Sequence, residues 1–249
     1  MKRLDDYSQH FLKNPRLVQE LVGHSNLKKT DLVYDIGAGS GVISSVLSRR
    51  VARVVAVEIE PEAIKKLRTN MQGLANVEII DADFLAMELP EEPYKVFANI
   101  PFHLSSKIIR KLTESPNLPQ SIYLIVQRQF ARKIVFSDNH FTGQIGALIG
   151  PQFTAKIRRP LRRTDFTPQP NVDTVLLELK KRDVPLVLHQ HMPKYRQFVS
   201  NCFSTPKVFL PAVAKSQTTP KDKKPSELTL DQWVNLFNDN QKPEPTRRA

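Results

Sequence analysis

Cysteine is almost absent from this chain, with Cys202 the one thiol in 249 residues. A single cysteine excludes an internal disulfide and any zinc cluster built on cysteine ligands. The six histidines include no pair at i, i+4 beside an acidic residue, which is the spacing of a helical zinc site. We therefore expect no bound metal, and we interpret His189 and His191 as surface residues.

Long apolar runs are also missing. No segment approaches the length of a transmembrane helix, and the N-terminus lacks a charged segment followed by an apolar core and a cleavage site. We therefore expect a cytoplasmic protein. Acidic residues are in deficit, because 37 Lys and Arg stand against 25 Asp and Glu for a net charge of +12. This charge favours a polyanionic partner; a membrane surface is the competing partner, and the missing apolar segments argue against it.

The dinucleotide motif G-x-G-x-x-G is a third absence. Residues 35–41 read D-I-G-A-G-S-G between an apolar run and a helical stretch, and Val42 stands where the third glycine would be. The chain therefore lacks the motif that seats a pyrophosphate on a helix N-terminus, which disfavours NAD. A strand, a tight turn and a helix are still predicted, with a backbone that a nucleoside can approach closely.

Acidic residues end the next two predicted strands. Glu58 follows the run 53–57, about 20 residues after the glycine turn, as ribose-binding acids do. Asp83 closes the run 77–84, where its carboxylate can accept from an adenine amine while Phe84 packs nearby. Each motif alone is compatible with an ordinary turn or a solvated strand end. Their order and spacing favour one nucleoside site.

The most informative motif is the tetrapeptide Asn99-Ile100-Pro101-Phe102, which follows the strand-like run 95–98. The Asn99 side-chain oxygen and the Ile100 carbonyl can accept hydrogen bonds from an exocyclic amine. Pro101 keeps the backbone irregular by removing a donor and fixing φ. Phe102 offers a flat face on which an extruded base can stack. These four residues are the predicted catalytic group of a base-modifying enzyme.

The predicted elements define the fold class. Strands near 32–36, 53–57, 77–80, 95–98 and 121–126 alternate with helical stretches, which is typical of an α/β doubly wound parallel sheet. Two later runs, 153–157 and 174–179, follow each other without a helix and predict an antiparallel edge pair.

Composition shifts near residue 184, which predicts two domains. We assign residues 1–183 to a cofactor-binding catalytic domain and 184–240 to a small helical domain, with 241–249 a disordered tail. Helices are predicted at 193–203 and 228–237, with Thr229 as N-cap and Trp233 in the core. The proline-containing stretch between these two helices is predicted to be irregular.

Basic side chains form three groups. The first, between the edge strands, contains Lys156, Arg158, Arg159, Arg162 and Arg163. The others follow the tetrapeptide and the next strand, and they contain Lys107, Arg110 and Lys111, and Arg128, Arg132 and Lys133. We interpret these groups as contacts to RNA phosphates around the active site, with a solvated surface as the alternative.

Four motifs together resemble the Erm family of erythromycin-resistance methyltransferases, which are relatives of the KsgA small-subunit rRNA dimethyltransferases. Residues 8–12, S-Q-H-F-L, are similar to the family's S-Q-N-F-L, and 99–102 are similar to its N-I-P-Y. Residues 123–132 resemble the strand and helix that flank the target base, and 166–174 resemble the loop F-x-P-x-P-x-V-x-S. The resemblance covers nearly the whole chain.

The resemblance implies a Rossmann-like class I methyltransferase sheet and S-adenosyl-L-methionine as the cofactor. It implies cofactor contacts from His10, Leu12, Gly37, Gly39, Gly41, Glu58, Asp83, Phe84 and Asn99. Asn99 and the Ile100 carbonyl would orient the target amine, with Phe102 and Phe130 on either side of the base. His10 stands where the family has Asn, and Phe102 stands where it has Tyr, which keeps stacking but removes a phenol hydroxyl.

The implied reaction is direct methyl transfer from a sulfonium to adenine N6, in which the enzyme positions the reactants rather than activates a nucleophile. An Asp at position 99 would also accept hydrogen bonds, so the choice of Asn stays open at this point. Ile100 and the short C-terminal segment favour Erm over KsgA. The predicted target is therefore one adenine of the peptidyl-transferase loop in naked or early-assembly 23S rRNA, methylated once or twice by a monomer. Macrolide, lincosamide and streptogramin B resistance would follow.

Three alternatives stand beside this prediction. The first is a KsgA-type 16S rRNA dimethyltransferase. The second is a non-catalytic RNA-binding relative, which the intact cofactor motifs argue against. The third is a DNA adenine methyltransferase; those enzymes carry D-P-P-Y or N-P-P-Y, so Ile100 argues against it.

Overall fold

A computed structural model describes residues 10–136 and 142–241. The chain divides into two compact units. The larger comprises Met1–Ala131 and Lys156–Lys181, and the smaller comprises Arg132–Ala155 and Arg182–Ala249. The composition shift near 184 gives no indication that 132–155 join the smaller unit. Ser8 and Gln9 of the S-Q-H-F-L motif lie outside the described residues, as does the predicted tail beyond Gln241.

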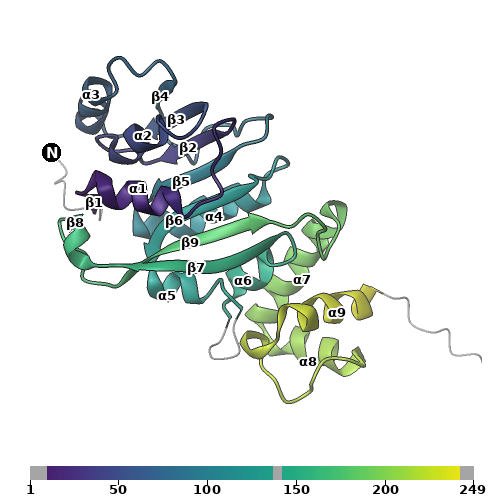
Figure 1. The fold of residues 1–249 in the computed structure, drawn as a ribbon. Coiled ribbons are helices and arrows are strands. Elements are labelled where there is room, and N and C mark those ends of the chain that lie inside the picture. Colours follow the sequence, from purple (N-terminus) through teal and green to yellow (C-terminus); the bar gives the residue numbers. More distant parts are fainter. Residues whose placement is uncertain (1–9, 137–141, 242–249) are drawn as a thin grey trace, which may run out of the picture. The chain divides into compact units, whose positions relative to one another are not determined.

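The larger unit is built on a sheet with the strand order β4-β3-β2-β5-β6-β9-β7 (Figure 1). Neighbouring strands are parallel throughout the part β4-β3-β2-β5-β6, and β9 is antiparallel to β6. This arrangement confirms the predicted α/β sheet and its antiparallel edge pair. The bounds are β2 Leu32–Ile36, β3 Arg53–Glu58, β4 Val77–Asp81, β5 Lys95–Asn99, β6 Ser121–Gln127, β7 Phe153–Leu161 and β9 Thr174–Lys181.

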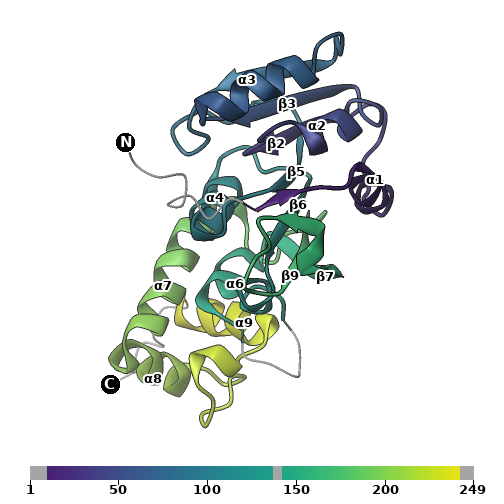
Figure 2. The same cartoon turned by 90° about the vertical axis from the view of Figure 1, so that its left-hand side faces the viewer.

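Helices cover both faces of this sheet, which is why its central strands are continuous apolar runs rather than alternating ones. The helices α1 (Pro15–Gly23) and α2 (Val42–Leu47) lie on one face, and α4 (Ser105–Glu114) lies on the other (Figures 1 and 2). The remaining helices of this unit are α3 (Pro61–Asn70) and α5 (Arg128–Arg132). Apolar residues of α1 and α2 share one buried cluster with Val33, Phe97 and Tyr123. This cluster is the main core of the unit.

The strand order reverses between β2 and β5, because β3 and β4 extend from one side of this pair and β6 from the other. In open α/β sheets, ligands bind in the crevice outside the carboxyl ends of the strands at such a reversal. Strand β2 is followed there by Gly37, and β5 ends at Asn99. The topology therefore brings the glycine turn and the tetrapeptide to the same place.

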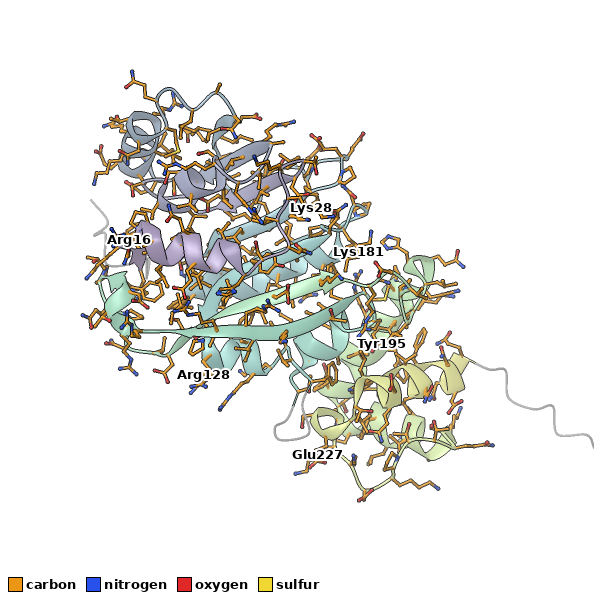
Figure 3. The ribbon with its side chains drawn as sticks, in the orientation of Figure 1. Arg16, Lys28, Arg128, Lys181, Tyr195 and Glu227 are labelled. Atoms are coloured by element: carbon orange, nitrogen blue, oxygen red, sulfur yellow. The ribbon has the colours of Figure 1, made fainter. Side chains whose placement is uncertain are left out.

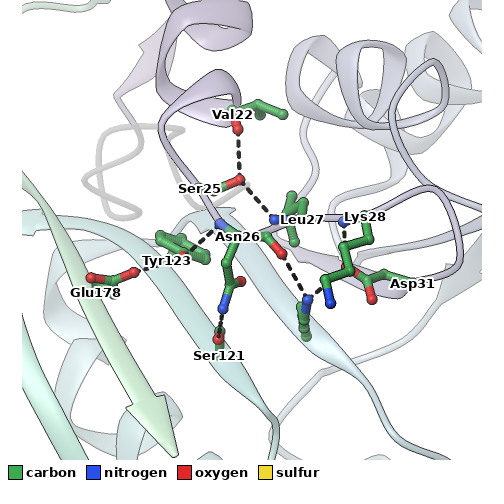
Figure 4. A network of polar contacts seen from close by, with 10 residues as sticks. Val22, Ser25, Asn26, Leu27, Lys28, Asp31, Ser121, Tyr123 and Glu178 are labelled. Atoms are coloured by element: carbon green, nitrogen blue, oxygen red, sulfur yellow. Dashed lines mark hydrogen bonds and ion pairs between the residues drawn. The ribbon is translucent and has the colours of Figure 1, made fainter.

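A polar network at the other edge of the sheet fixes where these strands begin (Figure 4). Lys95, the first residue of β5, pairs with Asp31 at 2.7 Å and donates to the Asn26 carbonyl at 2.9 Å. The Tyr123 hydroxyl accepts from the Asn26 amide and donates to Glu178. Burial raises the pKa of Tyr123, so the phenol stays a donor. The network holds the connection from α1 to β2 against the sheet.

The smaller unit contains α6 (Gln144–Ile149), α7 (Met192–Ser204), α8 (Pro206–Lys215) and α9 (Leu230–Gln241). Its core confirms the prediction for Trp233, which is fully buried and stacked on Phe203. The Tyr195 hydroxyl donates to the Ala147 carbonyl at 3.0 Å, which ties α7 to α6. Thr229 caps α9 as predicted, because its hydroxyl accepts from the Gln232 amide. Within the described residues, no helix has both the length and the apolar character needed to cross a bilayer.

Helix α8 corrects one sequence prediction, since its prolines predict an irregular stretch. Pro206 occupies the first helical position, where no amide hydrogen bond is sacrificed, and the Thr205 hydroxyl accepts from the Lys207 amide. Pro211 does remove one helical hydrogen bond, but Phe209 and neighbouring apolar residues of α8 are buried. Packing therefore outweighs the proline penalty, and the stretch that was predicted to be irregular contains a helix.

Candidate active site

A cavity of about 370 Å³ opens at the carboxyl edge of β2, β3, β4 and β5 in the larger unit. The end of each of these strands and the start of α4 contribute to its wall. Many of the predicted site residues line it, namely His10, Gly37, Glu58, Asp83, Phe84, Asn99, Ile100, Pro101, Phe102 and Lys107. Within the described ranges, no group of three or more His, Cys, Asp or Glu side chains could hold a metal ion.

The glycine turn adopts a backbone that other residues would strain. Gly37, Gly39 and Gly41 have φ values of 69°, 57° and 90°. A Cβ atom on Gly39 would lie 2.8 Å from the ring of Phe11, so this position also lacks the space for a side chain. Gly39 and Gly41 do not line the cavity itself, and Leu12 lines a small adjoining hollow. The turn is therefore shaped to let neighbouring groups approach its backbone.

Glu58 is 4% exposed, and its carboxylate is fixed by three backbone amides. One oxygen accepts from Gly39 at 2.7 Å, and the other accepts from Ile59 at 2.9 Å and Glu60 at 3.0 Å. A carboxylate has about four acceptor positions, so one remains for a ligand in the cavity. Glu58 thus joins the glycine turn to the end of β3 and presents a preoriented acceptor.

Asp35 begins the glycine motif, but its side chain does not line the cavity. The residue is fully buried, with Oδ2 accepting from the Ser44 hydroxyl at 2.6 Å and Oδ1 without a partner in the described part of the chain. Burial raises the pKa of Asp35 to about 7, and the nearby Glu58 charge adds to the effect. This carboxyl therefore holds its proton to a much higher pH than an exposed aspartate does.

Asn99 has the most informative side chain of the cavity. Its amide nitrogen donates to the main-chain carbonyl of His10 at 2.6 Å. Its amide oxygen is buried and has no hydrogen-bond partner among the described residues. The His10 carbonyl therefore determines which way the amide faces and leaves Oδ1 as an unused acceptor. This contact explains why residue 99 is Asn rather than Asp, because an ionised carboxylate has no hydrogen to donate to the His10 carbonyl.

The residues around Asn99 come from segments far apart in the chain. Strand β1 (Phe11–Leu12) pairs antiparallel with β8 (Phe166–Thr167), and the His10 ring bonds the Pro168 carbonyl at 2.8 Å. The rings of His10 and Phe102 lie 5.4 Å apart. Both motifs are visible in the sequence, but no spacing in it shows that they pair. Phe11 lines the cavity as well, a position to which the sequence motifs assign no role.

Phe130 is half-buried on α5 and does not line the cavity, so the structure does not place it opposite Phe102. Arg128 on the same helix is exposed and projects from the larger unit, as does Arg16 on α1 (Figure 3). Arg132 is also exposed and is counted with the smaller unit. The proposed base sandwich and rim contacts of α5 stay predictions.

The predicted arginine cluster is already engaged in ion pairs. Arg110 on α4 likewise pairs with Glu114, whereas the neighbouring Lys107 lines the cavity. Because the paired carboxylates offset much of the positive charge of these arginines, an RNA phosphate would have to replace the carboxylates. The pairs of the cluster are Arg158 with Glu178, Arg159 with Glu20, Arg162 with Asp165 and Arg163 with Asp173.

Comparisons with known proteins agree on the family. A family model described as ribosomal RNA adenine dimethylase matches residues 2–232. A ribosomal RNA small subunit methyltransferase A of Streptococcus equi subsp. zooepidemicus is 31% identical over 191 residues, which are 73% of this chain. The match spans 66% of the length of that relative, just under two thirds.

Two further matches cover more of the chain. An rRNA adenine N-6-methyltransferase of Bacillus licheniformis is 27% identical over 244 residues, which are 92% of this chain and 84% of that protein. The crystal structure of the 23S rRNA methyltransferase ErmE is similar with a TM-score of 0.78 and 25% identity, over 93% of this chain and 100% of that chain. The fold and the family assignment therefore agree.

Proposed function

The chain belongs to the ribosomal RNA adenine dimethylase family, a family of S-adenosylmethionine-dependent rRNA adenine-N6-methyltransferases, and we propose that its target is 23S rRNA. The proposed substrate is one adenine of the peptidyl-transferase loop, methylated once or twice by a cytoplasmic monomer. Resistance to macrolides, lincosamides and streptogramin B would follow. The unused, buried oxygen of Asn99 carries the proposed chemistry, because it belongs to a residue of the cavity wall and has no other task in the described part of the chain.

The residues of the cavity fit S-adenosylmethionine. Glu58 would bind the ribose through its remaining acceptor position, and Asp83 would bind the adenine. Asp83 is suited to this role because its Oδ1 is held by the Leu85 amide at 2.8 Å while the residue stays exposed at the cavity. The glycine turn would pass close to the amino-acid part. When bound, the cofactor supplies an electrophilic methyl group on its sulfur.

Methyl transfer then depends on positioning. Asn99 Oδ1 and the Ile100 carbonyl would accept hydrogen bonds from the target amine, and these bonds strengthen as positive charge develops on the nitrogen. Phe102 would stack on the extruded base, with the His10 ring beside it. No general base is required, because the fixed geometry of amine and methyl donor supplies the main rate advantage.

RNA would reach this cavity along the exposed basic side chains around it. Lys107 is at the cavity wall, and Arg162 has a side chain that is 85% exposed, so its pair with Asp165 is open to exchange for a phosphate. Splayed loop bases are what proteins read in RNA, which fits a naked or early-assembly rRNA. The same exchange predicts a strong salt dependence of binding.

The extent of the matches supports 23S rRNA as the target. The similarity to ErmE, a 23S rRNA methyltransferase, extends over 93% of this chain, whereas the Streptococcus small-subunit match covers 73% of it. Ile100 in the tetrapeptide supports the same choice. A small-subunit rRNA target is the second candidate, because the Streptococcus small-subunit enzyme has the higher identity, 31% against 27%.

The test compares methyl incorporation into naked 23S rRNA, 16S rRNA and duplex DNA, with Asn99→Ala as the inactive control. Primer extension then maps the modified base, and erythromycin susceptibility is scored in a sensitive bacterium that expresses the chain. A stop at one adenine of the peptidyl-transferase loop together with resistance is expected. Modification of 16S rRNA alone would move the assignment to the small subunit, and no incorporation into any substrate would contradict the enzymatic proposal.

A further inference from the structure

We propose that Lys111 is a positioning residue for the adenine end of the cavity, an inference that rests on the proposed function. Lys111 lies on α4 and does not line the cavity itself. Its ammonium donates to the carbonyl oxygens of Leu85, at 3.0 Å, and Met87. Both carbonyls belong to the turn that follows Asp83. Lys111 therefore joins α4 to the loop that presents Asp83 to the cavity.

This turn transmits the contact directly to Asp83. The Leu85 amide donates to Asp83 Oδ1 at 2.8 Å, and the Met87 amide donates to the Asp83 carbonyl at 3.1 Å. The two residues that bind Lys111 through their carbonyls thus bind Asp83 through their amides. A shift of the ammonium would displace the turn that carries both carbonyls, and with it the Leu85 amide that orients the Asp83 carboxylate.

Lys111 also supports the apolar part of the same subsite. Its ammonium lies 5.7 Å from the ring centroid of Phe84, within cation–π range. Phe84 is 6% exposed and lines the cavity next to Asp83. Ile108, three residues earlier on α4, lines the cavity too. Lys111 therefore sets the spacing between the wall from Phe84 and the wall from α4, where a flat adenine would enter.

A purely structural tie would have different consequences from a positioning residue. If Lys111 only stabilised the fold, its loss would lower the melting temperature and leave the affinity of the folded protein for ligand unchanged. If it positions the adenine subsite, the folded protein should lose affinity for any ligand that carries adenosine. The affinity loss should appear in KM for the cofactor while kcat at saturation is retained.

The experiment uses the full chain and isothermal calorimetry with two probes, S-adenosylhomocysteine and 5′-methylthioadenosine, which share adenosine but not the amino acid. Lys111→Met keeps the unbranched stem and removes the ammonium. We expect the Kd of both probes to rise about tenfold, since two charge-assisted hydrogen bonds are removed. Lys111→Arg keeps the charge and should raise Kd only about threefold. The matched control is Lys66→Met on α3, where the lysine is exposed, and its affinities should equal those of the wild type.

Each alternative outcome has a distinct meaning. Wild-type affinity for both probes in Lys111→Met would overturn the inference, as would an equal loss in Lys66→Met. A loss for S-adenosylhomocysteine alone would overturn the assignment to the adenine end. Should Lys111→Met not fold, the Kd values of Lys111→Arg decide, and unchanged values contradict the proposal. A wild type that binds neither probe would refute the proposed function, and this inference with it.

Discussion

Replacing Asn99 with Asp tests the central contact of the cavity with the smallest possible change. The variant keeps the side-chain shape and the oxygen that we propose as the acceptor for the target amine. It removes the donor that holds the His10 carbonyl, and it brings a carboxylate oxygen to the place where the amide nitrogen now lies 2.6 Å from that carbonyl. Two acceptors would then face each other in a buried position. The side chain must turn away, take up a proton or leave the His10 carbonyl unsatisfied.

The size of the effect follows from that part-buried carbonyl. Leaving a buried hydrogen-bonding group without a partner costs about 1–3 kcal/mol. Because about 1.4 kcal/mol corresponds to a tenfold change in rate, Asn99→Asp should lower kcat about 5- to 150-fold at pH 8. The negative charge would favour a cationic transition state, but only if the side chain keeps its orientation. The displaced orientation is expected to dominate.

The decisive signature is the pH dependence. In its neutral acid form, the carboxyl group that Asn99→Asp introduces can donate to the His10 carbonyl through one oxygen and accept through the other, as the amide does. Burial and the facing carbonyl raise the pKa of this acid. The activity of Asn99→Asp relative to the wild type should therefore rise as pH falls.

Single-turnover methyl transfer to rRNA provides the assay, run from about pH 5.5 to about pH 8.5 with wild type, Asn99→Asp and Asn99→Ala. Asn99→Ala loses both the acceptor and the donor and should be inactive throughout, while cofactor binding persists. Equal rates for Asn99→Asp and wild type at pH 8, or a constant ratio of the two across the range, would refute the idea that His10 orients the amide.

Three further predictions concern other parts of the larger unit. Glu58→Gln should raise the Kd of S-adenosylhomocysteine at least about tenfold in calorimetry, because the amide group meets three backbone donors; an unchanged Kd would contradict the ribose role. Arg162→Ala combined with Arg163→Ala should weaken RNA binding and reduce the slope of log K against log salt by about 0.7 for each phosphate that is no longer bound, while an unchanged slope would return both residues to a solvated loop. The pKa of Asp35 is about 7 in the folded protein against 3.8 in the unfolded chain. Between these two pH values the folded state binds the extra proton, so the free energy of unfolding of the wild type should fall by at most about 4 kcal/mol as the pH rises from the lower value to the higher one. Chemical denaturation of Asp35→Asn should lack this fall, and parallel curves for the two proteins would show that Asp35 is not its source.

The sequence predicted the sheet well because its signals are local. Five apolar runs alternate with helical stretches, and the order of Gly37, Glu58, Asp83 and Asn99 follows the strand ends of one fold class. The same locality explains the error at α8, where prolines at 206 and 211 argue for irregular chain and only buried packing against the rest of the smaller unit outweighs them. The pairing of strands far apart in the chain, such as β1 with β8, cannot be predicted from the spacing of the sequence motifs.

The arginine groups show the same limit at the site. Their density in the sequence indicates a phosphate surface, but the sequence cannot show that Glu20 reaches Arg159 or that Glu178 reaches Arg158. The orientation of the Asn99 amide is a further example. The amide is oriented by the main-chain carbonyl of His10, 89 residues earlier in the chain. Every residue has such a carbonyl, so the amino-acid sequence does not indicate this contact.

His10 contributes to the cavity in two separate ways, because its main-chain carbonyl accepts from Asn99 while its ring lies beside Phe102. Every residue type at position 10 offers the same main-chain carbonyl, so the orientation of Asn99 survives any substitution there that leaves the backbone in place. The side chain at position 10, by contrast, lies beside Phe102 in the cavity wall and is hydrogen-bonded to the Pro168 carbonyl. Substitutions at position 10 can therefore alter the cavity wall beside Phe102 while they retain the main-chain carbonyl that orients Asn99, the proposed acceptor for the target amine.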